Sequence, residues 1–166
     1  MAELRRGRRL GIDWGDARIG VAVSDPDGLL AVPLDFVAAG AEELRRLTDL
    51  VAEYDPLEVV VGLPRSLNGG EGPAALKIRG KVDGLAGALA ERFGTEAPPI
   101  RLMDERLSTV SASRRLRASG KSAKAQRTLI DSEAAREILD RALETERNSG
   151  TAPGQLLSPR SPSEPR

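Results

Sequence analysis

Three acidic positions in the sequence have the residue types and surroundings that metal-assisted chemistry requires. Asp13 lies inside the apolar stretch 9–15, where a carboxylate is costly to bury unless it is paired or binds a cation. Asp104 and Glu105 follow a second apolar stretch, and strand alternation lets only one of them face a common site. Asp131 precedes a run with helical spacing. Each also has an ordinary structural explanation, as a cap of the following turn, a charged turn, or an acid in the first turn of a helix.

The composition narrows the chemistry that these acids could perform. The 166 residues include no histidine and no cysteine. This excludes zinc sites built on Cys and His, thiol nucleophiles, Ser-His-Asp triads and iron–sulfur clusters with their usual ligands. A bound metal should therefore be a hard ion held by oxygen, Mg²⁺ or Mn²⁺. The glycines on the same strand face as Asp13, Gly11 and Gly15, are expected to leave space for such an ion and a phosphate.

The elements that must position the acids follow from the hydropathy pattern. Alternation and turn signals predict three strands over 9–15, 18–24 and 29–37, joined as an antiparallel meander. The remaining pattern predicts strands over 57–63 and 100–104, and helices over 42–54, 74–93, 110–118 and 131–145. This order predicts an α/β fold, a mixed sheet of a three-strand meander plus two parallel strands with helices on both faces. The first strand is then central, and the three acidic positions can converge.

The chain is expected to form one domain over residues 7–147. Residues 1–6 are interpreted as a flexible arm, and the Pro- and Ser-rich segment 148–166 as a disordered tail. No stretch approaches the roughly 20 apolar residues of a membrane span, and no signal peptide is recognisable, so a cytoplasmic location is expected.

Basic residues gather where a polyanion would have to run. The chain balances 25 basic against 25 acidic residues, yet residues 107–130 contain no acid. Their six bases are Arg114, Arg115, Arg117, Lys121, Lys124 and Arg127. The segment lies between Glu105 and Asp131, which favours contact with a phosphate backbone over a merely solvated helix face. Arg18, Arg65 and Arg106 are added as nucleic-acid contacts, and Arg5, Arg6, Arg8 and Arg9 form a second basic cluster.

Four blocks of the sequence resemble the YqgF/RuvX family. They are LGIDWGDARIGVAVSDPDG (10–28), VVVGLPRSLNGGEG (59–72), DERLSTVSA (104–112) and IDSEAAREIL (130–139). Members are described as pre-16S rRNA nucleases and as Holliday junction resolvases, with a fold similar to RNase H. The resemblance implies that Asp13, Glu105 and Asp131 are the catalytic acids and the metal ligands. The sequence departs slightly from the family pattern at Ser108, at Glu133 beside Asp131, and at Trp14, which could alter access to the site.

The resemblance implies a nuclease that uses Mg²⁺ or Mn²⁺, two ions in all, to hydrolyse structured nucleic acid. Structured RNA, specifically the 5′ end of pre-16S rRNA during ribosome biogenesis, is the preferred substrate. Junction DNA, cut by a Holliday junction resolvase in recombination and repair, is the alternative. A non-catalytic nucleic-acid-binding module also remains open, as does a homodimer. The block at 11–20 further resembles the first phosphate loop of actin-like ATPases and sugar kinases, but those need two such domains.

Overall fold

The computed structural model describes residues 5–64, 72–105 and 123–157, and within these ranges it leaves out the side chains of residues 105 and 123–131. Its elements, in chain order, are β1 (Arg9–Trp14), β2 (Arg18–Ser24), β3 (Ala31–Pro33), β4 (Val37–Ala38), α1 (Glu43–Tyr54), β5 (Glu58–Pro64), α2 (Pro73–Phe93), the 3-10 turn η1 (Gly94–Glu96), β6 (Ile100–Glu105), α4 (Ala123–Ser149) and β7 (Gln155–Leu156). The helix expected over 110–118 lies outside the described residues.

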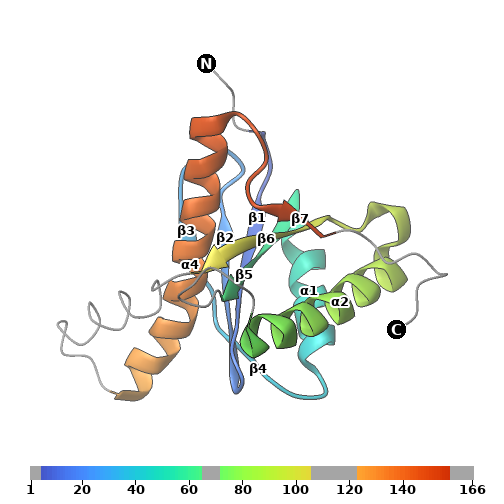
Figure 1. Ribbon diagram of the computed structural model, residues 1–166, viewed down its shortest axis with the longest axis vertical. Helices are drawn as coiled ribbons and strands as arrows, with labels where there is room; N and C mark the ends of the chain where they lie inside the picture. Colours follow the sequence, from blue (N-terminus) through green and yellow to red (C-terminus); the bar gives the residue numbers. More distant parts are fainter. Residues whose placement is uncertain (1–4, 65–71, 106–122, 158–166) are drawn as a thin grey trace.

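The strands form one mixed sheet in the order β3-β2-β1-β5-β6-β7, with β4 also paired to β2 (Figure 1). β1 lies in the interior, antiparallel to β2 and parallel to β5, and β6 continues the parallel part. The predicted combination of an antiparallel meander and two parallel strands around a central first strand is confirmed.

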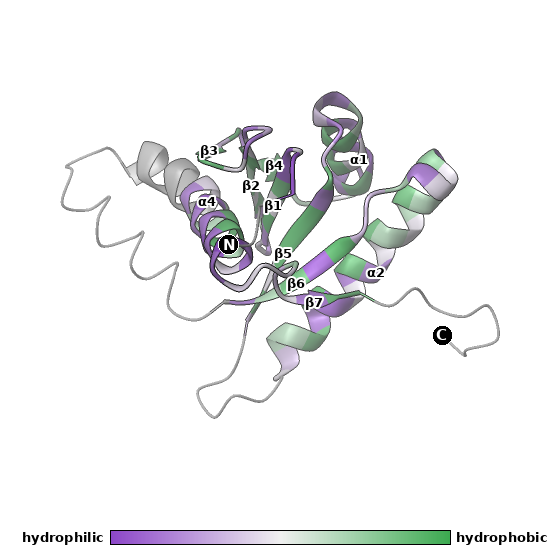
Figure 2. Cartoon of the chain, turned by 90° about the horizontal axis from the view of Figure 1, so that it is seen from above, coloured by the Kyte–Doolittle hydropathy of each residue, from purple (hydrophilic) through white to green (hydrophobic). Residues whose placement is uncertain are grey.

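Helices cover both faces of this sheet, as expected. Seen from above, α4 lies on one face, and α1 and α2 lie on the other (Figure 2). The larger core packs alternate β1 residues, Leu10, Ile12 and Trp14, against α1 and α2. The smaller core packs Val60 of β5 against residues of α4 such as Leu139. Among the helices in the described part of the chain, none is both long enough and apolar enough to cross a bilayer.

The expected strand 29–37 is interrupted. It forms two short pieces, β3 and β4, that both pair with β2. Between the pairs Ala22–Pro33 and Ile19–Val37, β2 has two residues and the other segment has three, so one residue is extra. The Leu34 N–H still donates to the Val21 carbonyl at 2.8 Å, so the extra residue lies between Leu34 and Val37.

Residues 148–157 and Arg5, which lie in the expected tail and arm, take part in the fold. The last helix extends to Ser149, and β7 pairs antiparallel with β6, where the Leu157 N–H donates to the carbonyl of Ile100. At the other end, Arg5 is anchored rather than flexible, since its guanidinium contacts both Glu58 and Glu146. Residues of the expected tail therefore contribute the end of α4 and β7, and Arg5 of the expected arm has two carboxylate partners.

A buried charge cluster ties the amino end of β1 to the carboxyl end of α4. The Arg9 Nη2 atom lies 2.8 Å from Glu146 Oε2, and both side chains are almost fully buried. Glu58, also buried, accepts from Arg5 and from Arg101, each at 2.8 Å. The interpretation of these N-terminal arginines as a nucleic-acid surface is wrong for Arg5 and Arg9. Both guanidinium groups form ion pairs inside the protein, Arg5 with Glu58 and Glu146, and Arg9 with Glu146.

Gly11 is where α4 comes nearest to β1. A Cβ at this position would lie 3.0 Å from the carbonyl oxygen of Ala135 and 3.0 Å from Leu139 Cβ. The strand and the helix are therefore in contact through backbone atoms, and a side chain would have to push them apart.

We predict that Gly11→Ala destabilises the protein by about 1–3 kcal/mol, the usual cost of overpacking. Gly80→Ala is the matched control, because an added Cβ there meets nothing within 4 Å. In the interior of α2 that change should stabilise by up to about 1 kcal/mol through helix propensity. Urea unfolding of both variants measures the difference, and equal effects would contradict the close packing at Gly11.

The charge cluster predicts a specific acid sensitivity. Burial by itself raises the pKa of Glu146, but hydrogen bonds from Arg5 and the charge of Arg9 outweigh it and hold the pKa below the ordinary value of 4.5. The stabilisation is therefore complete above about pH 4.5 and is lost as the pH falls through the lower, folded-state pKa.

Glu146→Gln leaves Arg9 buried without its charge partner and should cost roughly 3 kcal/mol near neutral pH. We expect the gap in unfolding free energy between wild type and this variant to shrink as the pH falls below about 4.5. Denaturant unfolding across pH 3 to 7 checks this, and a gap independent of pH would contradict it.

Candidate functional site

Asp13 lies in β1 on the side of the sheet that α4 covers. Its neighbours Ile12 and Trp14 belong to the core on the opposite side, whereas Gly11, two residues earlier, contacts α4. Strand alternation therefore gives Asp13 the same face as Gly11. The side chain of Asp13 is partly buried, and its backbone pairs with Gly20 of β2.

The direction of α4 brings Asp131 toward this position. Arg9 contacts Glu146 near the end of α4, and Gly11 approaches Ala135, so helix and strand run in opposite directions. Asp13 is two residues beyond Gly11, about 7 Å along the strand. Asp131 precedes Ala135 by four residues, about 6 Å along the helix. The backbone at Asp131 is thus at the level of Asp13.

Glu105 closes β6 at the same end of the sheet. Its backbone pairs with Pro64, and Met103, two residues earlier, pairs with Gly62. The parallel register of β1 and β5 pairs Ile12 with Val61, which puts Asp13 one step further, level with Gly62. The structure therefore brings the backbone positions of all three predicted acids to the carboxyl end of the parallel strands, beside α4.

The space expected from the glycines flanking Asp13 is not there. At Gly11 a Cβ would meet α4, and at Gly15 it would lie 2.3 Å from the carbonyl oxygen of Arg18. Both glycines are used for close backbone approach, one to a helix and one within the turn between β1 and β2. The expectation of open room for an ion and a phosphate at these two glycines is wrong.

Trp14 lies away from the α4 face and does not narrow it. The indole is almost fully buried, and its N–H donates to the Glu43 carboxylate at 3.0 Å. Lys81 of α2 lies 3.4 Å from the same carboxylate, and Lys77 pairs with Asp16 at 2.6 Å. The sequence did not predict that Glu43 accepts this hydrogen bond. The one clue was general: the N–H of a buried indole needs an acceptor.

Glu133, the additional acid beside Asp131, is paired within α4. Its carboxylate accepts from Arg136, which also binds Asp140 one turn later. These hydrogen bonds, with that of Glu133 the largest contribution, raise the pKa of Arg136. Burial raises the pKa of Asp140 against the opposing charge of Arg136. Glu133 is therefore engaged in a local ion pair.

The carboxylates fit a hard divalent ion by the chemistry of the donor set, since Mg²⁺ and Mn²⁺ prefer oxygen ligands. Among the side chains that the structure describes, no group of three acids is placed to hold an ion. The Glu105 and Asp131 side chains lie outside that set. Their roles as ligands remain predictions.

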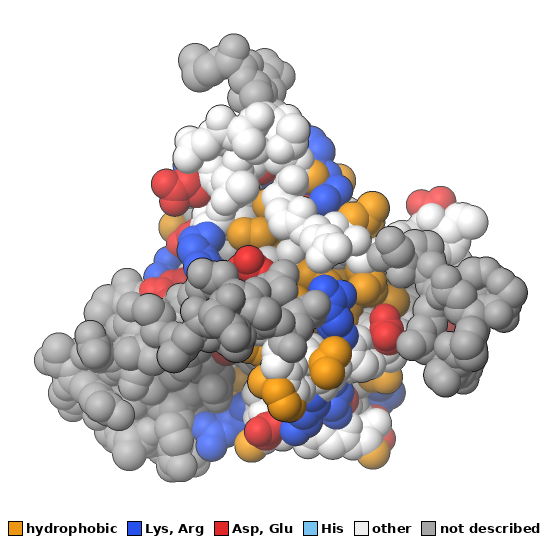
Figure 3. Space-filling view, viewed as in Figure 1, with side chains coloured by type: hydrophobic (Ala, Val, Ile, Leu, Met, Phe, Trp, Pro, Cys, Tyr) orange, Lys and Arg blue, Asp and Glu red, His pale blue; other side chains and the backbone are white. Residues whose placement is uncertain are grey.

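Most of the predicted nucleic-acid contacts lie outside the described residues, namely Arg65, Arg106, Arg114, Arg115, Arg117 and Lys121. The side chains of Lys124 and Arg127, near the start of α4, are likewise not described. Arg18 is described, and its guanidinium lies 5.6 Å from the centre of the Phe36 ring. On the face shown in Figure 3, basic and acidic side chains of the described residues are interspersed.

Comparison with known sequences identifies close relatives. The family described as "RuvX: Holliday junction resolvase" matches residues 7–145. A Streptomyces avermitilis protein named "Putative pre-16S rRNA nuclease" is 56% identical over 154 residues, covering 92% of this chain and 95% of its own length. A Thermobifida fusca protein of the same name is 46% identical over 162 residues, covering 93% of this chain and 98% of its own.

Solved structures support the fold. RuvC of T. thermophilus in complex with a Holliday junction substrate superimposes with a TM-score of 0.52 at 17% identity, over 89% of this chain and 99% of RuvC. The Fowlpox virus resolvase, bound to Holliday junction DNA, gives 0.50 at 8% identity over 83% and 97%. At these identities the likeness establishes the fold, the expected RNase H-like mixed sheet. Because the RuvX family matches residues 7–145 of this chain, the chain belongs to the RuvX family.

Proposed function

We propose that this chain is a divalent-metal-dependent nuclease that hydrolyses phosphodiester bonds of structured RNA, with the 5′ end of pre-16S rRNA as substrate. The observation that carries the proposal is the course of α4 across β1, which brings the backbone at Asp131 to the level of Asp13. Glu105 ends β6 at the same edge.

The proposed ligands are Asp13, Glu105 and Asp131. Such carboxylates, without histidine or cysteine, suffice for Mg²⁺ or Mn²⁺. Two bound ions would supply an activated water and neutralise the charge of the phosphate. The three acids come from separate elements, so their spacing depends on the packing of α4 and β6 against the central strands.

The choice of RNA rests on the relatives, which are named for pre-16S rRNA. The family description and the junction-bound structural neighbours favour a second candidate, four-way junction DNA. One carboxylate site could serve either polymer, since both present the same phosphodiester chemistry. The basic segment 107–130 is proposed to bind the phosphate backbone in both cases.

We predict that Asp13→Asn lowers the rate of cleavage by at least about 100-fold while the protein stays folded, because an amide cannot supply the charge that holds the ions. The measurement uses purified protein with Mg²⁺ on a pre-16S rRNA fragment and on a four-way DNA junction. Removal of the metal with EDTA should stop cleavage, and added Mg²⁺ or Mn²⁺ should restore it.

Asp16→Asn is the matched control, since Asp16 lies three residues later and its side chain is exposed and paired with Lys77. It should cleave as wild type does. Equal cleavage by Asp13→Asn and wild type would overturn the proposed site. If the protein cleaved the junction but not the RNA, the proposed substrate would be four-way junction DNA instead. If it cleaved neither, the alternative of a non-catalytic nucleic-acid-binding module would replace the nuclease.

A further inference from the structure

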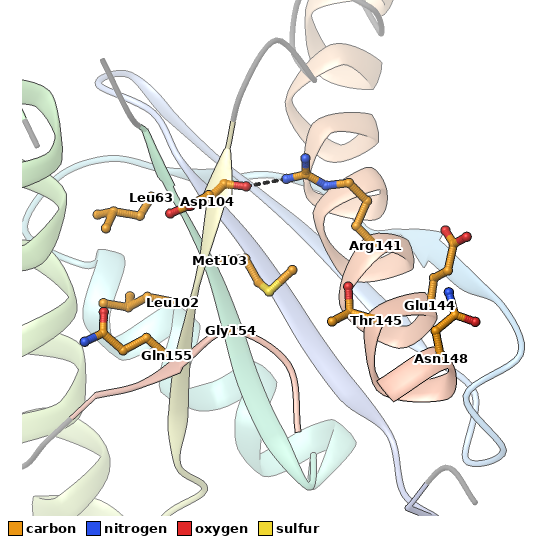
Figure 4. Close-up of a pocket in the computed structure, with 10 residues that line it drawn as sticks. All are labelled: Leu63, Leu102, Met103, Asp104, Arg141, Glu144, Thr145, Asn148, Gly154 and Gln155. Carbon is orange, nitrogen blue, oxygen red and sulfur yellow. Dashed lines mark hydrogen bonds between the residues drawn. The ribbon is translucent and has the colours of Figure 1, made fainter. Parts of the chain in front are cut away.

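A pocket of about 580 Å³ lies between the carboxyl half of α4 and the edge of the sheet formed by β6 and β7 (Figure 4). This volume is in the range of small-ligand sites, about 300–1,000 Å³. The α4 side chains on its wall come from consecutive turns and end, in chain order, in a guanidinium, a carboxylate, a hydroxyl and an amide. They are Arg141, Glu144, Thr145 and Asn148.

The polar side chains of this pocket have unused hydrogen-bonding capacity. The side chains of Thr145 and Asn148 are exposed, and neither makes a hydrogen bond within the described part of the chain. The Nε atom of Arg141 is buried and is the one buried side-chain polar atom in the described part of the chain that has no partner. Leaving such a donor unsatisfied costs about 1–3 kcal/mol. Because this atom has almost no accessible surface, it is not itself a contact point for a ligand in the pocket.

The side chain of Arg141, which forms part of the pocket wall, is held in place by a hydrogen bond to β6. Arg141 Nη2 donates to the backbone carbonyl of Asp104 at 2.6 Å. β7 pairs with Arg101 and Leu102 only, so this guanidinium satisfies an edge carbonyl beyond the reach of β7. Figure 4 shows Arg141 reaching from α4 to the strand, with the Met103 side chain between strand and helix.

The pocket adjoins the proposed metal site on the same face of the sheet. Met103 packs against the core beneath α4, and Glu105 follows it by two residues, about 7 Å along the strand. Arg141 follows Asp131 by ten residues, about 15 Å along the helix. A polynucleotide held at the acids could therefore place a neighbouring nucleotide in the pocket.

The charge of the lining selects the part of the nucleotide that fits. On the α4 wall the carboxylate of Glu144 offsets the single guanidinium of Arg141, so this wall carries no net positive charge to hold a phosphate. The Asn148 amide, the Thr145 hydroxyl and the Glu144 carboxylate on this wall offer both donors and acceptors, the combination found on the edge of a nucleobase. Met103 provides a polarizable apolar surface for a planar ring.

We propose that this pocket binds an unpaired nucleobase of the substrate strand, one or two nucleotides from the cleaved bond. The inference rests on the proposed nuclease function and extends it, because it makes unpaired nucleotides next to the cleavage position a requirement for tight binding. It also explains how a chain with few aromatic residues can contact an unstacked base.

Fluorescence anisotropy in EDTA tests binding without cleavage. The probes are a blunt RNA hairpin and the same hairpin with a three-nucleotide single-stranded extension. We expect wild type to bind the extended hairpin roughly tenfold more tightly, the effect of one well-held base. Thr145→Ala and Asn148→Ala should reduce that ratio toward one. Thr95→Ala is the control at an exposed threonine outside the pocket and should keep it.

Glu144→Gln distinguishes a base from a phosphate. Removing this negative charge should strengthen the preference for the extension if a phosphate occupies the pocket, and should leave or weaken it if a base does. A ratio near one in wild type, a ratio unchanged by both Thr145→Ala and Asn148→Ala, or a stronger preference in Glu144→Gln would each overturn the inference. Metal-dependent cleavage that Asp13→Asn abolishes would leave the nuclease function standing in all three cases.

Discussion

The arrangement of the molecule depends on the contact between the backbones of α4 and β1 at Gly11. Because this position carries no side chain, the helix comes within van der Waals distance of the strand at Ala135 and Leu139. The same approach sets the level at which α4 crosses β1, and therefore the level of its first described turns relative to Asp13. A residue of any other type at position 11 would change both packing and the spacing of the proposed ligands.

A second attachment, at the opposite end of the helix, fixes its direction. Arg9 and Glu146 form a buried ion pair that is extended by Arg5 and Glu58. Buried charges are stabilising only when they are fully paired, so this cluster tolerates little displacement of the helix end. The ion pair that fixes the carboxyl end of α4 and the proposed metal ligand Asp131 thus lie in different parts of the same helix.

Sequence periodicity predicted most of the sheet because alternation along β1 and β2 is regular, and the apolar run of β5 is typical of a strand covered on both faces. It could not predict β7, a two-residue strand in a Pro- and Gly-rich segment that is ordered by β6. The break between β3 and β4 depends on pairing with β2, which local sequence does not encode.

For the proposed site, the sequence singled out the three acids but misjudged the surroundings of Asp13. Gly11 suggested empty space, since nothing in a sequence distinguishes a glycine that opens a cavity from one that admits a helix. Arg5 and Arg9 suggested a basic surface because their partners, Glu58 and Glu146, lie about 50 and 140 residues away along the chain. The pocket at Arg141 and the acceptor at Glu43 arise from tertiary contacts alone.

The central claim, that β1, β6 and α4 together build one metal site, is tested most directly by paramagnetic broadening. Amide spectra of ¹⁵N-labelled protein would be recorded while Mn²⁺ is added at substoichiometric amounts. The account predicts that signals of Asp13, Glu105 and Asp131 and their neighbours broaden first and together, and that Asp13→Asn removes the effect. Broadening centred on other acids, or unchanged in Asp13→Asn, would contradict it.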